Sequence, residues 1–148
     1  MREKYLLELG GENTELGKYE ALELFSFKKY SPKLETDNGN IIIISTSKKI
    51  GKSLINRLSM TKRISNIIFT SIKEDIQSIL NDVENINIGD KSFAIRQIGQ
   101  NGLDSEKISI SIGEKISNKN KIELNNPEIT VLYHEKNNFI ISLCNSNW

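Results

Sequence analysis

Basic residues are concentrated in the middle of this chain, where they could neutralise an anionic partner. The segment 28–63 holds nine basic and two acidic residues, a net charge of +7. The segments 1–27 and 64–148 each carry a net charge of −3, so the whole chain stands at only +1. Clustered lysines and arginines are typical of surfaces that bind a phosphate backbone. The alternative is that these side chains only keep the surface hydrated.

Residues that could perform catalysis are few and scattered. The only histidine, His134, precedes a predicted turn, where a solvent-facing role is favoured over general-acid chemistry. The single cysteine, Cys144, is expected to be a small core or edge residue. Ile50-Gly51-Lys52-Ser53 ends like a phosphate loop but lacks the upstream glycine. Because no metal-ligand spacing occurs either, we expect this chain alone to be no enzyme and to hold no metal.

Composition favours a globular protein of one medium domain or two small ones. The 148 residues are 37% hydrophobic and 26% charged. No apolar run approaches the roughly 20 residues that a membrane span requires. The start of the chain does not resemble a signal peptide, and one cysteine fits a reducing compartment. We therefore expect a cytoplasmic protein that does not enter a membrane.

The first half of the chain alternates between strand and helix patterns. The run Ile41–Ile44 lacks alternation, which predicts a strand buried on both faces. Asn38-Gly39 predicts a tight turn before it. The resulting order is β-α-β-β-α-β, the ferredoxin-like pattern. The expected elements are a strand at 4–9, a helix capped by Asn13 or Thr14 with Leu16, Tyr19, Leu22, Leu24 and Phe25 on its apolar face, strands at 29–34 and 40–45, a helix capped by Ser47 with Ile50, Leu54, Ile55 and Leu58 on one stripe, and a strand at 65–70.

The second half predicts another small α+β unit. A helix at 72–83 with Ser71 as its cap is followed by a strand at 91–96 and a helix at 104–119. A hairpin at 128–144 comes after Asn126-Pro127. The predicted fold class is therefore α+β, with one domain at 1–70 and a second at 71–148.

Several segments, taken in order, resemble a known architecture. The order of elements after residue 91 resembles a THUMP domain, an RNA-binding module of tRNA-modifying enzymes. The opening segment resembles the start of archaeal and eukaryotic tRNA guanosine methyltransferases of the position-ten type. The segments that carry the resemblance are Tyr5–Leu16 and Leu54–Arg63 for that family, and Ser92–Arg96, Ile112-Gly113 and Asn125–Ile129 for the THUMP pattern.

The resemblance implies a ferredoxin-like domain at 1–70 followed by a THUMP domain with a mixed sheet at 71–148. It implies a tRNA-binding module that grips the 3′ CCA end of the acceptor stem and positions the tRNA for base modification. The methyltransferase domain, which would bind S-adenosylmethionine, does not follow here. The implied partners are thus tRNA and a methyltransferase domain or subunit, with no cofactor bound by this chain.

The resemblance also directs attention to particular basic residues. Lys91 and Arg96 on the THUMP strand are the first candidates for RNA contact, although Gln97-Ile98-Gly99 stands where THUMP domains often carry further basic residues. Each candidate has the alternative of a hydrated surface charge, and the supporting group could instead bind a partner domain. The further candidates are Lys107, Lys115 and Lys119 near the following helix, with Arg57, Lys62 and Arg63 in support.

Three other functions fit the same pattern. The chain could be a protein-interaction subunit of a tRNA methyltransferase with little RNA affinity of its own, which its low net charge favours. It could serve another THUMP-type enzyme, such as a thiouridine synthase. It could also be a free-standing enzyme with an unrecognised site.

Overall fold

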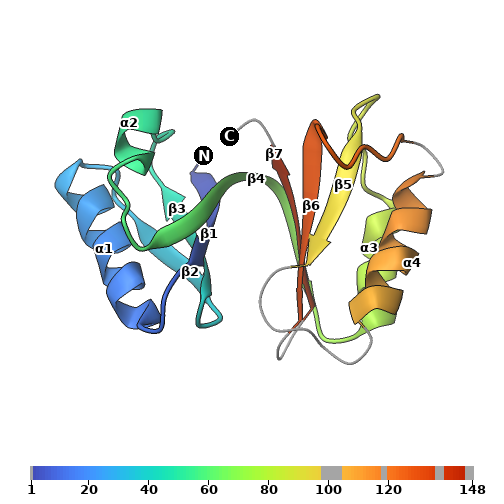
Figure 1. The fold of residues 1–148 in the computed structure, drawn as a ribbon, viewed down its shortest axis with the longest axis horizontal. Coiled ribbons are helices and arrows are strands. Elements are labelled where there is room, and N and C mark those ends of the chain that lie inside the picture. The colour runs from blue at the N-terminus through green and yellow to red at the C-terminus, as the bar shows by residue number, and fades with distance from the viewer. Residues whose placement is uncertain (1, 98–104, 118–119, 136–138, 146–148) are drawn as a thin grey trace. The chain divides into compact units, whose positions relative to one another are not determined.

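The computed structural model describes residues 2–97, 105–117, 120–135 and 139–145 (Figure 1). These residues form two compact units, and the division falls between Ile67 and Ile68, inside the strand β4. Each unit has its own hydrophobic core.

The first unit is a ferredoxin-like arrangement of helices and strands. Its strands are ordered β2-β3-β1-β4, and each described pair of neighbours is antiparallel. The sequence order β-α-β-β-α-β and this sheet order together confirm the predicted pattern. The elements are β1 (Glu3–Leu9), α1 (Thr14–Phe27), β2 (Lys33–Asp37), β3 (Ile41–Thr46), α2 (Lys52–Ile55) and the first part of β4 (Thr61–Lys73).

The helix α1 packs on the sheet through small residues. Asn13 caps the helix as predicted, because its side chain accepts a hydrogen bond of 3.1 Å from the backbone N–H of Leu16. The predicted apolar face is partly wrong, since Leu16 and Tyr19 are 50% and 59% exposed. The buried stripe instead follows four-residue spacing. It consists of Gly17, Ala21 and Phe25.

The strands around the first turn differ from the prediction at one end. Ile41–Ile44 is buried throughout, as expected for a strand covered on both faces. Gly39 has a φ of 79° in the predicted turn. The strand predicted at 29–34 is wrong: Lys29 and Ser31 have φ values of 62° and 47°, which an extended strand does not allow. The strand β2 therefore begins only at Lys33.

The helix α2 is much shorter than predicted and is not capped by Ser47. Its N-terminal flank is Gly51, which makes no side-chain capping bond. The hydroxyl of Ser47 instead donates to the backbone carbonyl of Tyr30 at 2.9 Å. The predicted apolar stripe still packs into the first core, with Ile50, Leu54 and Leu58 buried.

The Glu20 carboxylate of α1 forms hydrogen bonds with the loop after α2. Glu20 accepts hydrogen bonds from the backbone N–H of Met60 at 2.9 Å and of Ser59 at 3.2 Å, and from the Ser59 hydroxyl. Partial burial opposes ionisation, but these hydrogen bonds outweigh it and hold the pKa of Glu20 below its ordinary value.

The second unit contains a mixed sheet. Its strands are ordered β4-β7-β6-β5, with β5 parallel to β6 and β6 antiparallel to β7. The strand β5 stands at the end of this order, and the predicted mixed sheet is thus present. The elements after β4 are α3 (Ile76–Glu84), β5 (Phe93–Gln97), α4 (Ser105–Ser117), β6 (Ile129–Glu135) and β7 (Phe139–Asn145).

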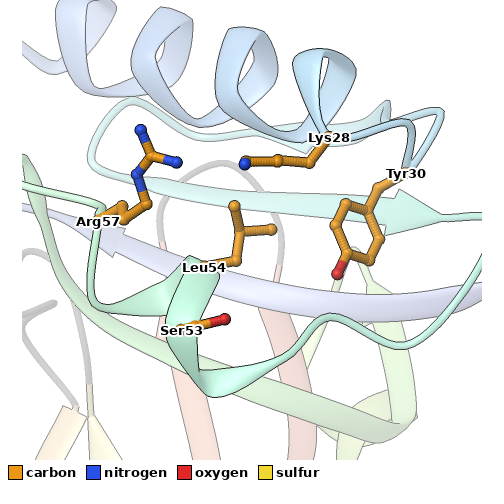
Figure 2. A pocket seen from close by; sticks show the side chains of 5 residues that line it. All are labelled: Lys28, Tyr30, Ser53, Leu54 and Arg57. Carbon is orange, nitrogen blue, oxygen red and sulfur yellow. The ribbon is translucent and has the colours of Figure 1, made fainter.

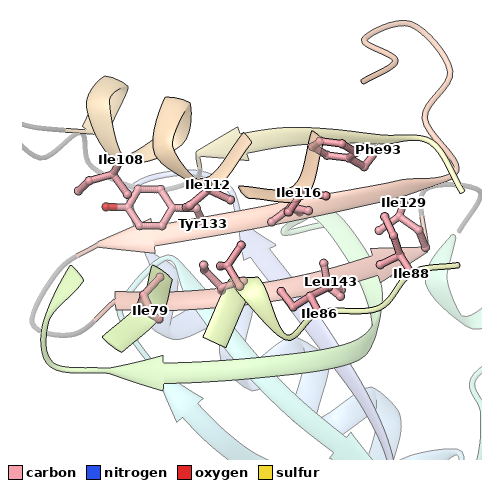
Figure 3. Close-up of a cluster of buried hydrophobic side chains, with 13 residues drawn as sticks. Ile79, Ile86, Ile88, Phe93, Ile108, Ile112, Ile116, Ile129, Tyr133 and Leu143 are labelled. Atoms are coloured by element: carbon pink, nitrogen blue, oxygen red, sulfur yellow. The ribbon is translucent and has the colours of Figure 1, made fainter. Parts of the chain in front are cut away.

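Both helices of the second unit contribute to one core (Figure 3). Ile108, Ile112 and Ile116 recur at four-residue spacing on α4 and are buried. Gly113 beside them keeps α4 close to β5, since an added Cβ would meet the Cδ1 atom of Ile95 at 3.2 Å. The other buried members are Ile79, Val83, Ile86, Ile88, Phe93, Ile129, Val131, Tyr133, Ile141 and Leu143.

The start of α3 corrects the sequence prediction. Ser71 is not its cap but a buried residue of β4, whose hydroxyl donates to Asp82. The cap is Asp75, which accepts a bond of 2.8 Å from the backbone N–H of Ser78, and this bond lowers the pKa of Asp75. The strand β4 continues through 71–73 because Ser71 and Ile72 can extend a sheet as readily as they start a helix.

Replacing Glu20 with Gln should lower the free energy of unfolding by about 1 kcal/mol at neutral pH, because the charge-assisted hydrogen bonds to Ser59 and Met60 weaken. The folded-state pKa of Glu20 is depressed, so its stabilisation is present above the unfolded-state pKa and is lost as pH falls through the folded value. Urea unfolding followed by circular dichroism should show the difference in unfolding free energy between the unmodified protein and Glu20→Gln closing as the pH falls below the ordinary glutamate pKa.

The matched control is Glu23→Gln, an exposed glutamate on the same helix, which should change stability by less than about 0.5 kcal/mol. An equal loss for Glu20→Gln at acidic and neutral pH would show that the charge of this carboxylate does not fasten the loop.

Candidate nucleic-acid interface

The second unit presents two predicted basic residues along its edge strand. Lys91 is exposed just before β5, and its backbone carbonyl accepts a hydrogen bond of 3.0 Å from the Asn120 side chain. Arg96 is half-buried on β5 itself. Four residues, Ser92 to Ile95, lie between the two, and five steps along an extended chain would span about 16 Å. They are therefore too far apart to bind one phosphate together, and their odd and even positions do not place them on one face of the sheet.

The face of β5 that carries Arg96 follows from the core. Phe93 and Ile95 pack into the cluster under α3 and α4. Because side chains alternate along a strand, Ala94 and Arg96 belong to the opposite face of the sheet.

The basic residues predicted on and near α4 differ in their exposure and ion pairing. Lys107 is exposed and forms no ion pair with the described residues. Lys115 in the last turn forms an ion pair with Glu84 of α3, so part of its charge is already neutralised. Lys119, predicted to share a face with Lys115, lies outside the described residues. Lys107 is thus the stronger of the two described candidates on this helix.

In the first unit the predicted basic residues lie on and before β4. Lys62 and Arg63 are adjacent, exposed residues of that strand. Arg57 follows α2 and is exposed, and its backbone N–H donates to the Leu54 carbonyl at 3.1 Å. Arg57 also lines a pocket that the sequence did not predict.

The pocket has a volume of about 320 Å³ and lies between the end of α1 and α2 (Figure 2). Figure 2 shows the Lys28 ammonium and the Arg57 guanidinium extending toward one another, with Leu54 beneath them. Neither cation forms an ion pair with a carboxylate of the described chain. The lining residues are Lys28, Tyr30, Ser53, Leu54 and Arg57.

Hydrogen bonds and ring packing hold Tyr30 in this pocket. Its backbone N–H donates to Phe25 at 2.9 Å, and its carbonyl accepts from the backbone N–H of Ser47 at 2.8 Å. Its ring meets the ring of Phe25 edge-on at 6.4 Å between centroids. The Lys48 ammonium lies 4.8 Å from the centre of the Tyr30 ring. These contacts therefore hold Tyr30 in the pocket wall without a ligand.

A further hydrogen bond holds the segment that leads into α2. The backbone N–H of Ile50 donates to the buried Tyr5 hydroxyl at 3.1 Å, and burial raises the pKa of Tyr5. The chain from Ile50 to Ser53 is the segment that ends like a phosphate loop. Because the upstream glycine is missing, that likeness predicted no phosphate site. The basic stretch 28–63, which begins with Lys28, indicated an anionic partner but no pocket, since Lys28 and Tyr30 lie far from Arg57 in the chain.

No described helix has the length and apolarity to cross a membrane. Within the same residues, no group of three or more His, Cys, Asp or Glu side chains is placed to hold a metal ion.

Solved structures share this fold over nearly the whole chain. PH1313 from Pyrococcus horikoshii Ot3 is 15% identical with a TM-score of 0.61, over 95% of this chain and 53% of that one. TrmN from Thermus thermophilus is 12% identical with a TM-score of 0.58, over 96% and 45%. A 4-thiouridine synthetase, solved in complex with RNA and ATP, is 12% identical with a TM-score of 0.52, over 97% and 41%.

These similarities confirm the predicted α+β fold class, in which a ferredoxin-like arrangement precedes a unit with a mixed sheet. The chain spans between 41% and 53% of the length of these three structures. At such identities the likeness concerns the fold alone.

Comparison of sequences is less informative. No protein-family model matches the chain. The GrpE protein of Borrelia garinii subsp. bavariensis is 27% identical over 138 residues, which are 90% of this chain and 71% of that protein. A chain rich in Ile, Asn and Lys gives chance identities more often than an average one. This match establishes no family.

Proposed function

We propose that this chain is a tRNA-binding module that grips the 3′ CCA end of the acceptor stem and positions the tRNA for base modification. The observation that carries the proposal is the fold. It matches 97% of this chain to part of a 4-thiouridine synthetase that was solved with RNA. Lys91 just before β5 and Arg96 on β5 supply charges for a single-stranded end, and Lys107 adds a further exposed cation in the same unit.

The mechanism of such a module is positional. A basic path follows the phosphates of the single strand, and contacts to the sugar and bases add affinity. Fixing one end of a rigid RNA sets the distance to a remote nucleotide, which supplies orientation without any catalytic group. Residues 1–70 and 71–148 are the proposed domains of this module.

Bond-making in this proposal belongs to another domain or subunit. A methyltransferase of the tRNA guanosine type is the favoured partner, because the segment Tyr5–Leu16 resembles that family. S-adenosylmethionine would bind to that partner and not to this chain. A thiouridine synthase is the second candidate, and the similarity to the 4-thiouridine synthetase favours it.

Binding of tRNA should be salt-sensitive and should depend on the CCA end. If about four phosphates are neutralised on a single strand, a plot of log affinity against log salt should have a slope of about −3. Removing CCA should weaken tRNA binding about tenfold, since the single-stranded RNA end that is proposed to lie along β5 is then missing. Filter binding or fluorescence anisotropy at several salt concentrations measures both quantities. Equal affinity with and without CCA would contradict the 3′-end grip.

Removing the charge of Lys91 or Arg96 should weaken tRNA binding selectively. Lys91→Gln and Arg96→Gln should each reduce affinity for intact tRNA about fivefold and make the salt slope shallower. The matched control is Lys73→Gln in the same unit, because Lys73 already forms an ion pair of 3.5 Å with Asp82. Thermal unfolding of each variant establishes that the fold survives. An effect of the control as large as that of Lys91→Gln would mean that only overall charge matters.

The competing proposal is a protein-interaction subunit without RNA affinity, favoured by the net charge of +1. Co-purification with a methyltransferase subunit, together with no tRNA binding at low salt, would select it.

A further inference from the structure

The pocket between α1 and α2 concentrates positive charge against a preformed wall (Figure 2). The Lys28 ammonium and the Arg57 guanidinium extend toward one another. Among the described residues no carboxylate pairs with either cation. An anion placed between them would receive charge-assisted hydrogen bonds from both sides.

The neighbouring residues add to this preference for an anion. Lys48 lies over the Tyr30 ring, and Lys52 is the first residue of α2, next to Ser53. The whole stretch 28–63 carries a net charge of +7. The described lining residues of the pocket all belong to this basic stretch, which therefore forms a concave site.

The size of the pocket indicates more than a bare phosphate. Its volume of about 320 Å³ lies at the lower end of the range of roughly 300 to 1,000 Å³ that small-molecule sites occupy. A phosphate group has five non-hydrogen atoms and would leave much of this space empty. The half-buried Tyr30 ring offers apolar surface to the carbon atoms of an attached group, with Leu54, only 4% exposed, at the base of the pocket. The Ser53 hydroxyl offers a hydrogen bond.

We infer that this pocket binds a sugar-phosphate unit of RNA, with the phosphate between Lys28 and Arg57 and the ribose against Leu54 and Tyr30. Arg57 suits the phosphate because its planar fork can donate two parallel hydrogen bonds, whereas Lys28 acts as a point charge. This inference rests on the proposed tRNA-binding function and adds a contact in the first unit, separate from β5. The same chemistry is present at a 5′-terminal phosphate and at an internal backbone phosphate.

The test is an NMR titration of the full 148-residue chain with ribose 5-phosphate, inorganic phosphate and ribose. Ribose 5-phosphate should produce saturable shifts in the backbone amides of Lys28, Tyr30, Ser53 and Arg57. It should bind more tightly than inorganic phosphate, and ribose alone should give no saturable shift. Lys28→Gln and Arg57→Gln should each weaken ribose 5-phosphate binding about tenfold. Lys33→Gln, an exposed lysine of β2 outside the pocket, should change it less than about twofold.

Short RNA oligonucleotides with and without a 5′-phosphate identify the source of the group. Both should lose affinity in Lys28→Gln and Arg57→Gln if an internal phosphate enters the pocket. Only the phosphorylated form should respond if a terminal phosphate enters. Equal effects of the pocket variants and of Lys33→Gln on ribose 5-phosphate and on both RNAs would overturn the inference.

Parallel measurement of tRNA affinity separates this inference from the proposed function. Absence of ribose 5-phosphate shifts in a chain that binds tRNA would remove the pocket and leave the β5 interface standing. Specific ribose 5-phosphate binding in a chain without tRNA affinity would confirm a sugar-phosphate pocket and remove RNA as its source.

Discussion

The first unit depends on the packing of α1 against its sheet through small residues. Gly17 faces Leu9 and Met60, where an added Cβ would lie 3.4 Å from atoms of both, an ordinary van der Waals distance. Ala21 and Phe25 continue the contact into the core. The helix ends at Phe27, and Lys28 at its C-cap lines the pocket together with Arg57 (Figure 2).

In the second unit, apolar packing determines the faces of β5. Phe93 and Ile95 turn into the core beneath α3 and α4, which assigns Arg96 to the opposite face of β5 (Figure 3). The parallel pairing of β5 with β6 fixes the register of that strand residue by residue, from Phe93 opposite Ile129 onward. The apolar residues of this unit thus determine the face on which Arg96 stands, and its proposed RNA contact follows from that placement.

Much of this fold was predictable from local patterns. Ile41–Ile44 and the four-residue spacing of Ile108, Ile112 and Ile116 are strong signals, since burial and periodicity act together. The apolar face of α1 was not predictable from hydrophobicity, because its buried positions include Gly17 and Ala21, which have little apolar surface, whereas Leu16 and Tyr19 are exposed. The cap of α3 was misassigned because Ser71 and Asp75 are both good capping residues, and tertiary pairing of β4 decided between them.

The candidate site was predictable only in part. The basic stretch 28–63 indicated an anionic partner, but the convergence of Lys28, Tyr30 and Arg57 requires the fold that brings α1 and α2 together. The most direct test of the central claim is photo-crosslinking from a tRNA that carries a photoreactive nucleotide at its 3′ end, with the linked peptides mapped by mass spectrometry. Crosslinks to residues 91–97 that disappear when the salt concentration is raised are the expected result. Crosslinks confined to the rest of the chain, or none at low salt, would contradict it.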